Sequence, residues 1–120
     1  MKYLLMIYMN PDVFEALSED EQQAVMNGHD GFIKTIEASG EMVGSVALVD
    51  PSSSRTVRVR DGLPAVTDGP YVEAKEFLAG YYVVSCETPA RAEELAAMIP
   101  DARLTAIEVR AVMNSGGMEM

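Results

Sequence analysis

His29 has the most distinctive chemistry in this sequence, because it is the only histidine among 120 residues. An imidazole takes up and releases a proton near neutral pH, which suits a general acid or base. Val25 precedes it by four residues and Ile33 follows by four, so the ring is expected on the apolar side of a helix. Two interpretations are open: an acid–base group facing a cleft, or a boundary histidine held by one hydrogen bond.

Asp68 is the carboxylate that we expect to act with His29. It ends a strand-like segment and is followed by Gly69 and Pro70, a turn that could direct the carboxylate into a cleft. The alternative is an Asx turn, in which the side chain bonds only to nearby backbone. Asp30 is a poor partner, because its side chain points about 100° away from His29 around the helix.

A ligand is predicted to be held by a lysine, an arginine and two tyrosines: Lys75, Arg58, Tyr71 and Tyr81. Lys75 could bind a carboxylate or enolate oxygen, and Arg58 an anion. Tyr81 and Tyr82 point to opposite faces of one strand, so one is expected to line the cleft and the other to pack at an interface. The structural alternatives are a salt-bridged loop for Lys75, protection of an edge strand for Arg58, and core packing for the tyrosines.

Neither a metal nor a cofactor is indicated by the motifs. Cys86 is the only cysteine, so no internal disulfide can form, and one cysteine with one histidine does not make a zinc site. A glycine-rich dinucleotide motif and a phosphate loop are both missing from the sequence. We therefore expect chemistry that needs no cofactor.

The composition limits the class of partner. The formal net charge of −10 argues against binding to nucleic acid or to an anionic membrane surface. No apolar run is long enough to span a membrane, and the N-terminal run lacks the pattern of a signal peptide. The lone cysteine fits a reducing compartment, so a cytoplasmic location is expected.

The predicted elements alternate along one globular domain, residues 1–112, followed by a flexible tail, 113–120. Strands are expected at 2–8, 42–49, 78–86 and 105–112, with a hairpin at 55–60 and 65–67. One helix starts at the Ser18 cap and ends near Ala38, and a second starts after Thr88 and ends at Pro100. Without the hairpin the order is βαββαβ, the ferredoxin-like α+β plan.

The strands carry apolar residues on both faces, for example Leu4 and Met6 against Leu5 and Ile7. Two helices can cover only one face of a four-stranded sheet. The apolar residues on the other face of the sheet therefore predict a homodimer that forms through this sheet face.

The segment 67–76 carries the signature Asp68-Gly69-Pro70-Tyr71 and is followed by Gly80-Tyr81-Tyr82. These motifs resemble the DGPF-domain, or YCII-related, family, and the resemblance extends over nearly the whole chain. Two positions depart from the family pattern: Tyr71 stands in place of phenylalanine, and Ala111 in place of proline.

The resemblance implies a dimeric α+β barrel of two ferredoxin-like subunits, each with a cleft between sheet and helices. It also implies an active-site pair of a histidine on the first helix and an aspartate, and His29 stands at the matching place. Some family members are encoded beside extracytoplasmic-function sigma factors.

Three hypotheses about function are open. The first is a small-molecule-binding dimer, with or without isomerase- or lyase-like acid–base chemistry by His29 and Asp68. The second is a non-catalytic accessory or regulatory module that acts with an extracytoplasmic-function sigma factor. The third is a structural dimer in which the signature only locks the fold.

Overall fold

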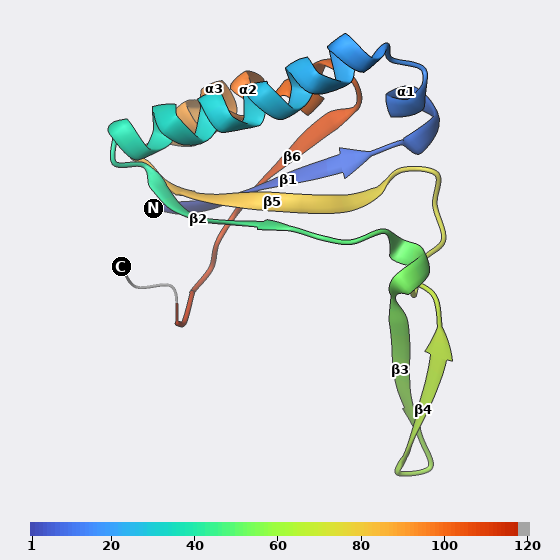
Figure 1. The fold of residues 1–120 in the computed structure, drawn as a ribbon. Coiled ribbons are helices and arrows are strands. Elements are labelled where there is room, and N and C mark those ends of the chain that lie inside the picture. The colour runs from blue at the N-terminus through green and yellow to red at the C-terminus, as the bar shows by residue number, and fades with distance from the viewer. Residues whose placement is uncertain (118–120) are drawn as a thin grey trace.

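The computed structural model describes residues 1–117. Four antiparallel strands form a sheet in the order β2-β5-β1-β6, comprising β1 (Lys2–Met9), β2 (Met42–Ala47), β5 (Phe77–Ser85) and β6 (Ala106–Ala111). Two helices, α2 (Glu19–Ala38) and α3 (Pro89–Met98), cover one face (Figure 1). Short helical segments connect these elements: α1 (Pro11–Glu15), η1 (Pro51–Ser53) and η2 (Pro100–Arg103). This arrangement confirms the predicted ferredoxin-like α+β fold.

Both long helices begin at the predicted caps. The Ser18 hydroxyl accepts from the Glu21 backbone N–H at 3.1 Å, and the Glu21 carboxylate accepts from the Ser18 N–H at 3.0 Å. This reciprocal pair satisfies two N–H groups that a helix start leaves unbonded. At α3, Thr88 accepts from the Arg91 N–H, and Pro89 occupies the first turn, where no N–H is required.

The core lies between the helices and the sheet. Tyr3, Leu5 and Ile7 of β1 alternate with half-buried residues and are themselves buried. They pack with Phe32 and Ile36 of α2, and the predicted α3 stripe completes the cluster with Ala92, Leu95, Ala96 and Ile99. The apolar residues that alternate along the strand and those that recur at helical spacing thus pack together in one layer.

The opposite face of the sheet has no helix over it (Figure 1). Its side chains include Leu4 and Met6 of β1 and Tyr81 of β5, which are half-buried in the single chain. Val46 of β2 pairs with Tyr81 and is 40% exposed. This face therefore carries the apolar surplus that the sequence indicated.

The inserted hairpin consists of β3 (Arg55–Arg60) and β4 (Leu63–Asp68), and it projects from the sheet on the side away from the helices (Figure 1). Asp61 and Gly62 form its tip, with φ angles of 53° and 77°. Positive φ at both central residues is typical of the type I′ turn, whose twist matches that of the strands.

No helix within residues 1–117 is long and apolar enough to cross a membrane. In the predicted tail, Ser115 accepts a hydrogen bond from the Lys2 ammonium at 3.1 Å. The last part of that tail, residues 118–120, lies outside the described residues.

Candidate functional site

His29 stands between a phenol and a carboxylate. Its Nδ1 lies 2.8 Å from the Tyr82 hydroxyl, and its Nε2 lies 2.6 Å from Oδ1 of Asp101. The three side chains come from α2, β5 and η2, and we call them the His29 network. Phe32 packs edge-on against Tyr82 at 4.9 Å between ring centroids, which fixes the phenol from the other side.

A close approach of two backbones brings Asp101 to His29. Gly28 precedes the histidine and Pro100 precedes the aspartate. A Cβ on Gly28 would lie only 2.5 Å from Cγ of Pro100. Because Gly28 has no side chain, η2 can lie directly on α2, and the carboxylate then reaches the ring.

The hydrogen bonds determine one consistent arrangement of protons. A carboxylate only accepts, so Nε2 of His29 carries the hydrogen and donates it to Asp101. In the neutral ring, Nδ1 then accepts from the Tyr82 hydroxyl. Burial raises the pKa of Tyr82 to about 12, and the carboxylates of Asp101 and Asp30 contribute to the increase. Tyr82 therefore keeps its proton at neutral pH and acts as a donor.

A cavity of about 350 Å³ opens beside the network, between α2, η2 and the edge formed by β2 and β5. Its wall is mostly apolar, and the polar groups besides the network include Asp30 and Ser45. None of the described residues that line it is a lysine or an arginine. The His29 side chain is 23% exposed, so it faces this cavity and is not sealed against aliphatic side chains.

Gly80 shapes the floor of the cavity. A Cβ at this position would collide with the carbonyl oxygen of Val46 on the neighbouring strand. β5 also carries an irregularity here, since the pairing with β1 shifts between Ile7 and Tyr8. The glycine of the Gly80-Tyr81-Tyr82 motif thus permits β2 to approach β5 where Tyr82 turns toward His29.

The structure of the single chain does not bring Asp68 to His29. Asp68 ends β4 at the base of the hairpin, where its side chain is 90% exposed and lies 3.7 Å from Nε of Arg55. The carboxylate beside His29 is Asp101. Within one chain the predicted pair of His29 and Asp68 is therefore not in contact, because Asp68 ends a strand of the projecting hairpin and not an element that packs on α2.

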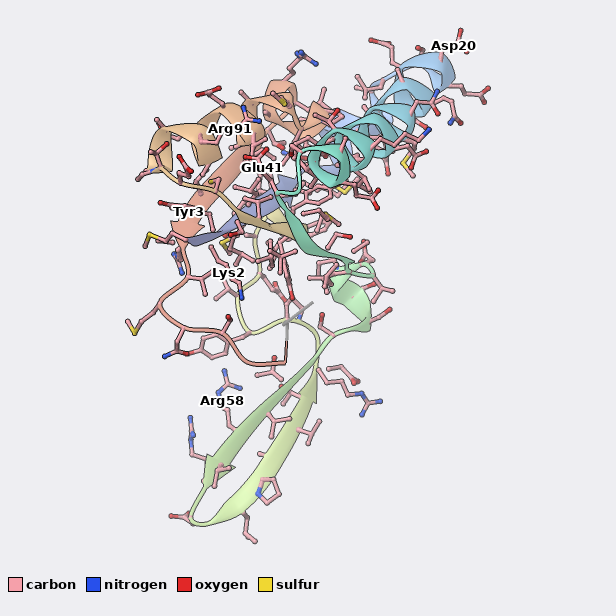
Figure 2. All side chains as sticks on the ribbon, turned by 90° about the vertical axis from the view of Figure 1, so that its left-hand side faces the viewer. Lys2, Tyr3, Asp20, Glu41, Arg58 and Arg91 are labelled. Carbon is pink, nitrogen blue, oxygen red and sulfur yellow. The ribbon has the colours of Figure 1, made fainter. Side chains whose placement is uncertain are left out.

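The predicted ligand-binding residues divide between two places. Tyr81 borders the cavity beside His29, but the strand register places its side chain on the face of the sheet opposite to that of Tyr82. The Arg58 guanidinium stacks on the Tyr71 ring, 5.3 Å from its centroid, and Figure 2 shows Arg58 on the hairpin, far from the helix layer. Lys75 is exposed in the loop between β4 and β5. None of these three residues lines the cavity beside His29 in one chain.

The signature segment instead borders a second hollow of about 560 Å³ at the base of the hairpin. Pro70, Val72, Phe77 and Leu78 contribute apolar wall, together with Tyr8 at the end of β1. Gly69 adopts a φ of 95° and its N–H donates to the Ser54 carbonyl at 2.7 Å. The signature thus closes the base of the hairpin.

Asp101 was not singled out by the sequence, and Tyr82 was expected only as the partner of Tyr81 on the same strand. Asp101 follows the proline that ends α3, a position that normally marks only a helix stop. The signal in the sequence was a glycine before the histidine, Gly28-His29, and a proline before the aspartate, Pro100-Asp101. It can be interpreted only once α2 and η2 are known to be in contact. Within residues 1–117, no group of three His, Cys, Asp or Glu side chains is arranged to hold a metal ion.

Comparison with known proteins identifies relatives of this chain. The chain is 30% identical over 86 residues to an uncharacterised protein from Rhizobium meliloti (strain 1021), covering 72% of this chain and 69% of that protein. The family described as the YCII-related domain matches residues 1–115, nearly the full length of the chain. This chain therefore belongs to the YCII-related domain family.

Proposed function

We propose that this protein binds a small neutral molecule in the cavity beside His29 and transfers a proton on it without a cofactor. The observation that supports this proposal is the His29 network, in which an imidazole joins a phenol to a carboxylate at the wall of a mostly apolar cavity. A histidine that only stabilised the fold would need one hydrogen bond and no cavity. The absence of basic side chains among the described lining residues, together with Asp30 and Asp101, disfavours an anionic ligand.

The network offers a route for the proton. A C–H or O–H proton of the ligand passes to the Tyr82 oxygen while the Tyr82 proton moves to Nδ1 of His29. Asp101 stabilises the imidazolium that results, and the reverse transfer returns a proton to the ligand. Because the pKa of Tyr82 is raised to about 12, a free phenolate is unfavourable, and the two transfers are expected to be coupled. Isomerisation or a lyase reaction next to a carbonyl group fits this chemistry.

We also propose that two subunits pack through the face of the sheet that no helix covers. Leu4, Met6 and Tyr81 would then lose their remaining contact with water. Burial of apolar area contributes roughly 25 cal/mol per Å² to such an association.

Proton transfer can be tested before a substrate is known. The protein is incubated in D₂O with a panel of neutral ketones, lactones and 1,3-dicarbonyl compounds, and deuterium entering each compound is followed by NMR. His29→Gln should reduce the exchange rate by about 10²–10⁴-fold, the usual contribution of a general acid or base. Asp101→Asn should also reduce it, because the amide does not stabilise an imidazolium.

Asp68→Asn is the matched control, since it makes the same chemical change at a side chain that is 90% exposed and remote from His29. We expect it to exchange at the wild-type rate. Equal rates for wild type and His29→Gln would refute proton transfer by His29. Loss of exchange in Asp68→Asn, together with the wild-type rate in Asp101→Asn, would instead support the pair of His29 and Asp68 that the sequence suggested.

A further inference from the structure

The hairpin formed by β3 and β4 has one apolar face. The strand register places Val57 opposite Val66, and Val59 opposite Pro64. Side chains two residues apart on a strand share a face, so these four residues form one patch. The three valines are 61%, 62% and 54% exposed at positions 57, 59 and 66. The chain thus builds an apolar surface that it does not itself cover.

A hairpin of two strands is marginally stable at best in water when nothing packs against it. Here β3 and β4 pack chiefly on each other. Thr56 donates a hydrogen bond to the Gly69 carbonyl at the base, and Arg58 stacks on Tyr71. Nevertheless both strands run for six residues and end in a regular turn. A further surface is therefore needed to stabilise the hairpin.

The total surface of the chain leads to the same conclusion. Its accessible area is 8067 Å², whereas a compact monomer of 13.0 kDa exposes about 6,300 Å². The surplus of roughly 1,700 Å² falls within the range that each subunit of an obligate homodimer buries, about 1,000–2,500 Å². The chain has the surface of half an assembly.

The direction and charge of the hairpin indicate that the partner in this assembly is a second copy of the chain. It projects on the side of the sheet that lacks helices, which is the side where a second subunit would sit (Figure 1). Six extended residues reach about 20 Å, twice the distance of about 10 Å between packed sheets. Residues 55–68 hold three of the nine basic residues and two acids, so the acidic excess of the net charge of −10 lies in the rest of the chain. A second copy of the chain therefore presents an acidic surface to the hairpin, which carries a net positive charge.

We propose that the β3–β4 hairpin is an intersubunit arm, which packs the apolar face of Val57, Val59, Pro64 and Val66 against a second copy of this chain. The two arms of the dimer clasp the partner's sheet in a reciprocal manner, as two-fold symmetry requires. This inference rests on the sheet-face dimer proposed above and adds the arm to it. It does not depend on the chemistry of His29.

The test compares two double variants by sedimentation velocity over a wide range of protein concentration. Val57→Asp with Val59→Asp places two charges on the apolar face, and we expect the dimer dissociation constant to rise about a hundredfold, since each valine buries substantial apolar area. Ala65→Asp with Thr67→Asp places the same charges on the opposite face of the arm and should change it much less. Circular dichroism verifies that both variants keep the core, which the arm does not enter.

Hydrogen exchange read by mass spectrometry is the second measurement. Backbone amides of residues 55–68 should be protected at concentrations where the wild type is dimeric and exchange rapidly where it is monomeric. A wild type that is monomeric throughout would overturn both the arm and the sheet-face dimer. If the wild type is dimeric, but the two variants dissociate equally and the arm amides exchange rapidly, the arm is overturned and the sheet-face dimer stands. The deuterium assay on His29 is independent of both results.

Discussion

Replacing Gly28 by alanine should separate α2 from η2 and break the contact between His29 and Asp101. The new Cβ would lie 2.5 Å from Cγ of Pro100, whereas carbon atoms in contact are about 3.5–4.0 Å apart. The proline ring cannot rotate away, so the two elements must move apart by at least about 1 Å. The distance from Nε2 to Oδ1 is 2.6 Å, and the same movement would lengthen it beyond a normal hydrogen bond.

The expected loss of stability follows from three contributions. A lost hydrogen bond to a charged group costs about 1.5–3 kcal/mol, and overpacking typically costs about 1–3 kcal/mol. These two costs overlap, because the movement that relieves the collision also breaks the bond. Alanine is favoured over glycine inside a helix by about 1 kcal/mol. The net change in the free energy of unfolding should be about 2 kcal/mol, or a melting temperature lower by about 8 °C.

Gly31→Ala is the matched control, because Gly31 lies on the same helix and a Cβ there would meet nothing within 4 Å. It should stabilise the protein by about 0.5–1 kcal/mol through helix propensity alone. Urea unfolding of both variants measures the two free energies. Since His29 is the only histidine, its hydrogen-bonded Nε2–H gives a single downfield NMR resonance, which should vanish in Gly28→Ala and persist in Gly31→Ala.

A Gly28→Ala variant that is as stable as Gly31→Ala and keeps the resonance would refute this reasoning. In that case α2 and η2 would not be held as closely as the contact between Gly28 and Pro100 indicates. A destabilised Gly28→Ala that retains the resonance would show that the close approach supports packing and not the position of Asp101.

Three further predictions concern other parts of the fold. Tyr82→Phe should remove the last step of an alkaline absorbance titration, because burial raises the pKa of Tyr82 to about 12. Because the folded protein favours the neutral phenol, Tyr82 stabilises the fold fully below pH 10, and this contribution is lost as the pH rises toward 12. A last titration step that survives in Tyr82→Phe would contradict the assignment of that step to Tyr82. Glu41→Gln should lower the urea midpoint more at pH 7 than near pH 2, because the Arg91 guanidinium, bound at 2.9 Å through two nitrogens, lowers the pKa of Glu41. Because its pKa is lowered in the folded state, the Glu41 carboxylate stabilises the fold at pH values above its ordinary pKa of 4.5, and this contribution is lost as the pH falls through the pKa of the folded state. Equal losses at both pH values would be inconsistent with this ion pair. Gly69→Ala should loosen the base of the hairpin at a cost of roughly 1–2 kcal/mol, because a φ of 95° is strained for any residue with a Cβ; faster exchange of amides 55–68 would confirm it, and unchanged exchange would refute it.

Most of the fold could be predicted from the sequence because the signals that define each element are local. The Ser18–Glu21 capping box acts over three residues, and the Asp61-Gly62 turn acts over two. The strands followed from the run of apolar and aromatic residues in the segments that became β1 and β5. The ferredoxin-like plan followed from the alternation of strands and helices, since only a few topologies join such elements with short connections.

The sequence by itself determined the βαββαβ plan, the hairpin and the position of His29 on the inner side of the first long helix. Only the tertiary structure decided which carboxylate His29 meets. Asp68 was the stronger candidate along the chain because of its turn, but 72 residues separate His29 from Asp101, the aspartate that contacts it. That contact depends on how closely η2 packs on α2, which the missing side chain of Gly28 permits. Packing distance between elements is a property of the folded core, and no local pattern of residues encodes it.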